Sequence, residues 1–250
     1  MIDDLKSFLD EKVDKYNHTS FIENDPILIP HQFEAKADIE IIGFIMATIA
    51  WGNRKSIINN GHRLIEIMGN TPLEFVLNAS ESDLKDLKFV HRTFNADDLR
   101  FFLTTMKSYY SIGSGLEGLF NKGNTVYERI CNFRESLLTN EHQKRTEKHI
   151  SNPAKGSAAK RINMFLRWMV RKDNRGVDFG LWDSIPTKEL MLPLDVHTGN
   201  ISRKLGLLQR KQNDWKALEE IMVELRKMDP HDPVKYDFAL FGLGVSKEFE

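Results

Sequence analysis

Apolar residues recur every three or four positions through most of the chain, with polar residues between them. This spacing is typical of one face of an α-helix, and no stretch alternates apolar and polar residues over the length of a useful strand. The pattern predicts helices over residues 1–22, 38–50, 56–68, 82–87, 96–110 and 125–138, then a basic helix ending near 171, and further helices to the end of the chain. We therefore expect an all-α fold.

Several polar residues stand where helices are expected to begin. Asp38 and Asp214 each precede an apolar periodic stretch and are predicted N-caps, because a short acceptor side chain can bond the free N–H groups of a first turn. Thr71-Pro72 has the form of a cap followed by proline at the first helical position.

The composition is that of a globular protein able to bury a large core, with 250 residues of which 41% are hydrophobic. Cys131 is the single cysteine, which excludes a disulfide framework and a metal cluster made of cysteines alone. No run of about 18 apolar residues occurs, and the first residues are acidic, unlike a signal peptide. We expect a cytoplasmic protein with no membrane partner.

Positive charge is concentrated in one part of the chain. Residues 142–175 hold ten Lys or Arg and two acids, a local charge of +8, so the rest of the chain carries −9 of the total of −1. A charge run of this kind is commonly a solvated helix face. A run this dense beside a glycine turn also fits a polyanionic partner.

The basic helix has two distinct faces. At about 100° per residue, one arc is apolar, while Lys160, Arg167 and Arg171 share the opposite arc. The preceding Pro153-Ala-Lys-Gly156 turn can leave backbone N–H groups free at the start of this helix, where the helix dipole favours a phosphate. A glycine turn followed by a basic helix suits contact with a nucleic-acid backbone irrespective of its sequence.

Four features occur in a characteristic order: the turn with Gly156 and its basic helix, Pro193-Leu-Asp195-Val-His197, the run 203–207 (Arg-Lys-Leu-Gly-Leu), and the run 237–244 (Asp-Phe-Ala-Leu-Phe-Gly-Leu-Gly). This order resembles the helix-hairpin-helix (HhH-GPD) DNA glycosylase superfamily. More closely, it is similar to an uncharacterised bacterial family related to the 8-oxoguanine DNA glycosylases. The resemblance covers roughly residues 38–245.

The resemblance implies a single two-lobed helix-hairpin-helix glycosylase-like unit. One helical lobe is expected over 38–140, and the hairpin, basic helix and catalytic-aspartate segment over 141–210. Residues 1–37 and 211–250 are expected to complete the second lobe. The implied partner is damaged duplex DNA, bound by a monomer.

The implied chemistry is excision of a damaged base, such as an oxidised purine, with Asp195 as catalytic carboxylate. A carboxylate can stabilise the positive charge that develops on the sugar when an N-glycosidic bond breaks. The plainer interpretation of Asp195 is a helix N-cap, and one side chain can do both. Implied DNA contacts are Lys155, Gly156, Ser157, Lys160, Arg161, Arg167 and Arg171.

A base taken out of the duplex is held by aromatic or apolar side chains. The implied base pocket is formed by Trp51, Asn53, Trp168 and His197, with Trp182 as a further aromatic candidate. Each tryptophan also suits an ordinary core position, and a histidine here is commonly structural.

The chain departs from the superfamily pattern in three ways. The hairpin lacks the first of the usual glycines. Ala158 occupies the place of the lysine nucleophile of lyase-type relatives, so Lys160 would act as the catalytic lysine only with a shifted register; a phosphate contact is its other role. No cysteines follow Gly244, so no iron–sulfur cluster is expected, and no other cofactor or metal.

Two alternatives remain open. The first is a DNA- or RNA-binding protein that keeps the helix-hairpin-helix fold and has lost catalysis, which the altered hairpin favours. The second is a metal-dependent hydrolase using His231-Asp232, although this dipeptide lies between two prolines, as in a turn, and lacks partner ligands at metal-site spacing.

Overall fold

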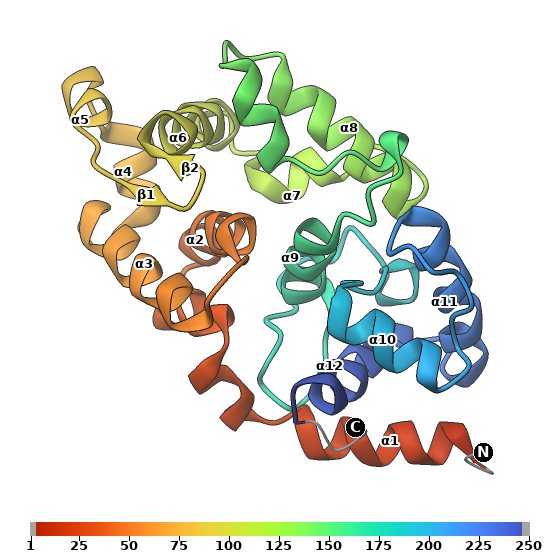
Figure 1. Cartoon of the computed structure of the whole chain (residues 1–250). Coiled ribbons are helices and arrows are strands. Elements are labelled where there is room, and N and C mark those ends of the chain that lie inside the picture. The colour runs from red at the N-terminus through yellow and green to blue at the C-terminus, as the bar shows by residue number, and fades with distance from the viewer. Residues whose placement is uncertain (1–3, 247–250) are drawn as a thin grey trace. The chain divides into compact units, whose positions relative to one another are not determined.

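The computed structural model describes residues 4–246, and these residues are mostly helical, which confirms the all-α class. The chain forms two compact units (Figure 1). We call Glu23–Ser151 the mid-chain unit, and Met1–Ile22 together with Asn152–Glu250 the terminal unit. The mid-chain unit includes residues on both sides of the expected 38–140 lobe, so it covers a longer part of the sequence than predicted.

The mid-chain unit is a set of helices with one very short hairpin. Its elements in chain order are η2 (Pro26–Leu28), η3 (Pro30–Gln32), α2 (Lys36–Ile49), α3 (Arg54–Ile67), α4 (Pro72–Asn78), α5 (Glu81–Lys85), β1 (Val90–His91), β2 (Phe94–Asn95), α6 (Ala96–Ser111), α7 (Gly115–Phe120), α8 (Val126–Leu138) and η4 (Lys144–His149).

Helix α2 is the centre of the mid-chain unit, as its continuous apolar sequence predicts. Every residue from Ile39 to Ile49 is buried. The ring of Phe44 packs edge-on against Phe102 of α6 and Phe133 of α8, each with centroids 5.5 Å apart. Edge-to-face packing of this kind stabilises aromatic pairs beyond the area they bury.

Asp38 caps a different helix from the one predicted. Helix α2 begins two residues before Asp38, with Ala35 at its N-cap position. The Asp38 carboxylate instead accepts a hydrogen bond from the backbone N–H of Leu73, at 2.7 Å, in the first turn of α4. Thr71, at the N-cap position of α4, makes no side-chain cap hydrogen bond. Asp38, 35 residues before Leu73, supplies the acceptor. Pro72 takes the first helical position as expected.

A two-residue hairpin interrupts the helices, and the sequence pattern did not predict it. β1 and β2 pair antiparallel, with His91 opposite Phe94. Arg92 takes a left-handed conformation, φ 56°, in the turn between them. A strand of two residues is too short to show an alternation of apolar and polar positions.

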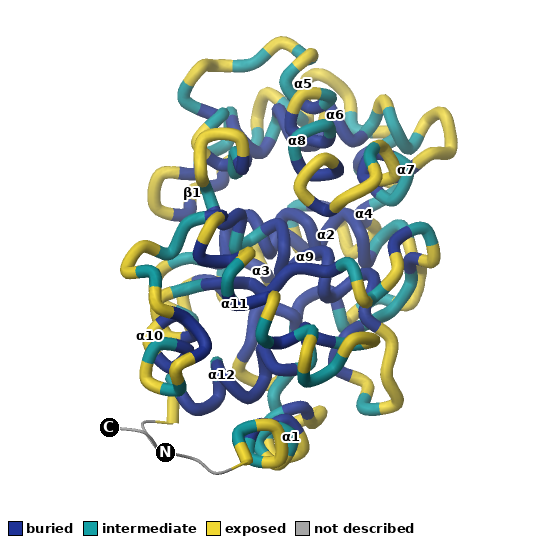
Figure 2. Tube along the Cα trace, turned by 90° about the vertical axis from the view of Figure 1, so that its right-hand side faces the viewer, coloured by how far each residue is buried: buried dark blue, intermediate teal, exposed yellow. Residues whose placement is uncertain are grey.

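The terminal unit combines the first helix with the last hundred residues. Its elements are α1 (Leu5–Tyr16), the turn η1 (Thr19–Asn24) where the chain leaves the unit, η5 (Pro153–Lys155), α9 (Lys160–Val170), η6 (Thr187–Glu189), α10 (Val196–Lys204), α11 (Trp215–Met228), η7 (Pro233–Lys235) and α12 (Tyr236–Ser246). Helices α9 and α12 are buried along most of their length (Figure 2).

Helix α12 packs against α1 and against α10 (Figure 1). Gly242 permits the first contact, since a Cβ there would lie 2.3 Å from the Tyr16 ring. Helix α1 is shorter than the predicted 1–22: it ends at Tyr16, where the N–H of Asn17 bonds the Val13 carbonyl, and a 3₁₀ turn follows. Residues 1–3 of that prediction lie outside the described residues.

Asp38→Ala is expected to lower the free energy of unfolding by about 1 kcal/mol, because the α4 cap is lost. Asp38→Asn keeps an acceptor oxygen and should cost less. Urea denaturation of the three proteins measures the difference. Equal stability of the alanine variant and the wild type would show that the Leu73 N–H gains nothing from this carboxylate.

Candidate functional site

The turn before α9 contains two left-handed residues. After the 3₁₀ turn η5, Gly156 has φ 86° and ψ 4°, and its N–H bonds the Pro153 carbonyl at 2.8 Å. Ala159, at the N-cap of α9, has φ 47° and ψ 38°, which is unfavourable for a residue with a Cβ. It has no side chain that could cap α9. Lys160 is thus the first residue of a helix that begins without a side-chain cap.

The same turn is tied to the start of α11. The N–H of Trp215 donates to the carbonyl of Gly156 at 2.9 Å, and Ser157 forms an isolated antiparallel bridge with Asp214. Asp214 caps α11 as predicted, accepting from the Ala217 N–H at 3.0 Å. These bonds hold a glycine-containing loop in one geometry.

Lys160 and Asp195 lie beside each other. The Lys160 ammonium nitrogen is 3.5 Å from Oδ2 of Asp195, and the two side chains are 31% and 17% exposed. The other carboxylate oxygen, Oδ1, accepts from the Thr198 N–H at 2.9 Å and so caps α10. One oxygen of Asp195 therefore holds the helix and the other faces the amine. The two residues named as catalytic candidates form one site.

The backbone of Asp195 is supported by residues that the sequence patterns did not indicate. Asn213 donates from Nδ2 to the Asp195 carbonyl at 2.8 Å, and Arg203 in turn donates to the Asn213 side-chain oxygen at 2.6 Å. Gly199 leaves room for the amide, since a Cβ there would be 2.6 Å from that oxygen. Asn213 is 18 residues from Asp195, so no local motif could reveal the contact.

The two residues after Asp195 are exposed. Val196 is 66% exposed although it is apolar. The His197 ring lies edge-on to Phe241, with centroids 6.3 Å apart, and its backbone contacts α12 where Gly244 has no side chain. Both residues directly follow Asp195 in the sequence. His197 stays a candidate for contact with a bound ligand.

The prediction of an anion-binding face on α9 is wrong for two of its three residues, Arg167 and Arg171. Arg167 and Arg171 share a face with Lys160, as the helical spacing predicts, but they are buried, at 3% and 2% exposure. Arg167 pairs with Asp178 and Asp237, and Arg171 pairs with Asp173, Asp178 and Asp232. Their charges are neutralised inside the unit, so neither can contact a DNA phosphate.

The other predicted contact residues are at or near the surface. Lys155 and Gly156 are exposed, and Ser157 is half-buried, with its hydroxyl accepting from the Ala159 N–H at 3.2 Å. Arg161 is half-buried, and burial lowers the pKa of its guanidinium to about 10. The candidate surface is thus the turn and the first residues of α9, not the length of the helix.

Trp168 and Trp182 are core residues. They are 0% and 1% exposed, and Trp182 packs edge-on against Phe165 at 5.4 Å between centroids. A fully buried ring has no face to offer a base, so the prediction of Trp168 in a base pocket is wrong, and Trp182 is likewise excluded.

Trp51 and Asn53 belong to the mid-chain unit. The Arg92 guanidinium lies 4.5 Å from the centroid of the Trp51 ring, and His91 Nε2 is 3.1 Å from the Trp51 carbonyl. Asn53 caps α3, accepting from the Ser56 N–H at 3.1 Å. One face of the tryptophan is therefore already covered by a cation, and the Asn53 oxygen already serves a helix.

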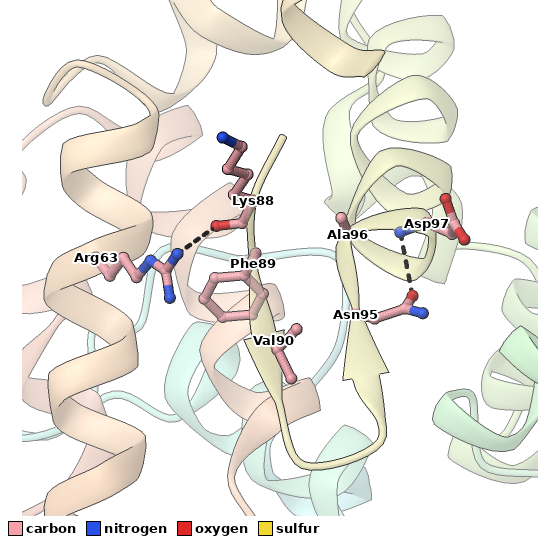
Figure 3. A pocket seen from close by; sticks show the side chains of 7 residues that line it. All are labelled: Arg63, Lys88, Phe89, Val90, Asn95, Ala96 and Asp97. Carbon is pink, nitrogen blue, oxygen red and sulfur yellow. Dashed lines mark hydrogen bonds between the residues drawn. The ribbon is translucent and has the colours of Figure 1, made fainter. Parts of the chain in front are cut away.

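The mid-chain unit also has a shallow pocket of about 330 Å³ between α3 and the start of α6 (Figure 3). Its polar groups are largely engaged within the unit: Arg63 donates to the Lys88 carbonyl at 2.7 Å, and Asp97 pairs with Arg100 at 2.8 Å. No residue predicted for catalysis, DNA contact or the base pocket lines it.

The metal-hydrolase alternative gains no support. The Asp232 carboxylate is bound by Arg171, at 2.9 Å, and His231 is exposed in the turn capped by Asp229. Among residues 4–246, no group of three or more His, Cys, Asp or Glu side chains is placed to hold a metal ion. Within the same residues, no helix has both the length and the apolar character needed to span a membrane.

Residues 25–246 match the model of a family described as a protein of unknown function (DUF2400). The match covers most of the chain, so this protein belongs to that family. A search of curated proteins and a search of solved structures each find no match.

Arg171→Met is expected to lower the free energy of unfolding by about 3–5 kcal/mol, because it removes a buried cation from the buried carboxylate of Asp178 and the half-buried carboxylate of Asp232. Lys172→Met is the matched control: Lys172 is the next residue and is exposed, and it pairs with exposed Asp183. Its loss should cost less than about 1 kcal/mol. Chemical denaturation distinguishes the two, and similar small effects would contradict a structural role for Arg171.

Proposed function

We propose that this protein is a DNA glycosylase of the helix-hairpin-helix type, two-lobed as the resemblance implies, which removes a damaged base from duplex DNA. The observation that carries the proposal is the Lys160–Asp195 pair, at 3.5 Å, directly after the glycine-containing turn. An amine and a carboxylate at one partly exposed site, at the start of a helix that has no side-chain cap, suit an attack on a sugar held by its phosphates.

Lys160 supplies the nucleophile in this proposal. Its amine, after losing a proton, attacks C1′ of the nucleotide; the N-glycosidic bond breaks and the base departs with the bonding electrons and takes up a proton. The sugar ring then opens to give an imine between C1′ and the lysine nitrogen. Ala158, in the usual lysine place, is buried, whereas the Lys160 side chain is 31% exposed. This favours the shifted register.

Asp195 has two roles in the proposed reaction. Its Oδ2 lies beside the amine, where it can receive the proton and stabilise positive charge developing on the sugar. Its Oδ1 keeps the carboxylate in place through the Thr198 N–H. Asn213 bonds the Asp195 backbone carbonyl and is itself held by Arg203, which limits movement further, and such fixed geometry favours catalysis.

The proposed DNA contacts are Lys155, Gly156, Ser157, Lys160 and Arg161. The first turn of α9 has no side-chain cap, so its backbone N–H groups add to the positive charge of the two lysines. This small surface lies beside the proposed nucleophile in sequence, so a phosphate bound there would place the adjoining sugar close to Lys160.

The first test is a cleavage assay on duplexes with single lesions, beginning with 8-oxoguanine opposite each base, with borohydride added to trap an imine as a stable amine. Wild type is expected to release a base and to form a covalent adduct. Lys160→Ala should form no adduct. Asp195→Asn should lose at least about 100-fold in rate, because a catalytic charge is removed.

Asp195→Asn can still cap α10 with its amide oxygen, so its melting temperature should remain near that of the wild type. A variant that is folded but inactive would show that the carboxylate is needed for the reaction and not only as the cap of α10. Tight DNA binding by the wild type without cleavage of any lesion in a broad panel would favour the alternative, a nucleic-acid-binding member of the fold that has no catalysis.

DNA binding should weaken as salt rises, because phosphate contacts release counterions. Lys155→Gln is expected to reduce the slope of log affinity against log salt by about 1, the effect of losing about one phosphate contact. Lys172→Gln, an exposed lysine past the far end of α9, is the control and should leave the slope unchanged. Equal effects of the two substitutions would reject the turn as the contact surface.

A further inference from the structure

A single face of α9 carries three cations, and the structure engages each with acids. Lys160 and Arg167 are seven residues apart, and Arg171 follows after four more, so all three lie on one side of the helix. Lys160 pairs with Asp195 at the accessible end. Arg167 and Arg171 are buried farther along, with acids on both.

This cluster has more carboxylates than cations. The three cations pair with five acids, which are Asp173, Asp178, Asp195, Asp232 and Asp237. Burial disfavours an uncompensated charge, and two carboxylates that share a cation disfavour each other's ionisation. Asp237 is 6% exposed and shares Arg167 with Asp178, so it is one of the acids that this surplus affects.

Asp237 stands in the first turn of α12, where several charged groups face it. Arg167 and Lys160 face it from α9, Asp178 from the loop after α9, and Asp195 from the cap of α10. The charged groups of α1 and η7 at this end of α12 are Asp10 and Lys235, which pair with each other at 3.1 Å.

We infer that Asp237 is a positioning residue of the Lys160–Asp195 site: its buried carboxyl shares Arg167 with Asp178 on the face of α9 that also carries Lys160, and its protonation sets the electric field at the Lys160–Asp195 pair. It acts through the shared field of the α9 face and through Arg167. The expected effect of Asp237 on reactivity rests on the proposed function, whereas the titration of Asp237 does not.

The electrostatics agree with the geometry. The pKa of the Asp237 carboxyl is raised from 3.8 to about 6: burial is the largest cause, Asp195 and Asp178 also raise it, and Arg167 and Lys160 oppose the rise. Because the folded-state pKa is above the ordinary value, this carboxyl favours the folded state most below pH about 4. That contribution is lost as the pH rises through about 6.

The titration can be measured without DNA, by ¹³C NMR of the aspartate side-chain carboxyls in the full-length protein. One carboxyl is expected to titrate with a midpoint near pH 6, and Asp237→Asn should remove it. The Asp195 signal should show an inflection at the same pH in the wild type and none in the variant. Absence of any aspartate titrating between pH 5 and 7, or an Asp195 signal without the inflection, overturns the inference.

The effect on reactivity is measured by borohydride trapping as a function of pH. Asp237→Asn removes a negative charge near Lys160 above pH 6, so half-maximal trapping should move to lower pH by about half to one pH unit. The matched control is Asp232→Asn, which removes an acid of the same cluster at the Arg171 end. It should leave the profile in place.

Equal profiles for Asp237→Asn and the wild type would reduce Asp237 to a structural residue and overturn its positioning role. The two proposals fail separately. If the wild type forms no adduct at any pH, the glycosylase proposal fails, while the NMR titration still decides whether Asp237 holds a proton next to Asp195. Asparagine retains an acceptor for Arg167, so the variant is expected to fold, which its melting temperature checks.

Discussion

The buried ion pairs along α9 are the interaction on which the terminal unit depends. Two guanidinium groups with 3% or less exposure are tolerable only because acids from three separate segments surround them. These acids belong to the loop after α9, the turn before η7 and the first turn of α12. The pairs therefore fix how the segments after α9 are arranged around it, including α12, against which α10 and its cap Asp195 pack.

The helices and several caps were predictable because they depend on residues close in sequence. Asp195 and Asp214 cap the helices that follow them, as local chemistry predicts. Asp38 shows the limit of this reasoning, since its acceptor serves a helix that begins 34 residues later. A hydrogen bond to a donor this far along the chain cannot be predicted from a local sequence pattern.

The charged face of α9 shows a second limit. Helical periodicity correctly places Lys160, Arg167 and Arg171 on one side, but periodicity does not say what that side meets. The compensating acids are scattered from residue 173 to residue 237, so a local charge of +8 looked like a surface for an anion. For the same reason, the roles of Asn213 and Asp237 at the site could not be predicted from the sequence. Lys160 and Asp195 were each predicted from a motif of their own.

The terminal unit is assembled from both ends of the chain. Leu9 and Val13 of α1 are buried, and α1 packs on α12, whose last described residue is Ser246. On the ribosome the mid-chain unit emerges complete long before α12, and domains tend to fold as they emerge. Helix α1 therefore keeps its apolar stripe uncovered until α12 has been synthesised. A helix made before the mid-chain unit thus packs only after that unit is complete, and a chain that stops before α12 leaves α1 without this packing partner.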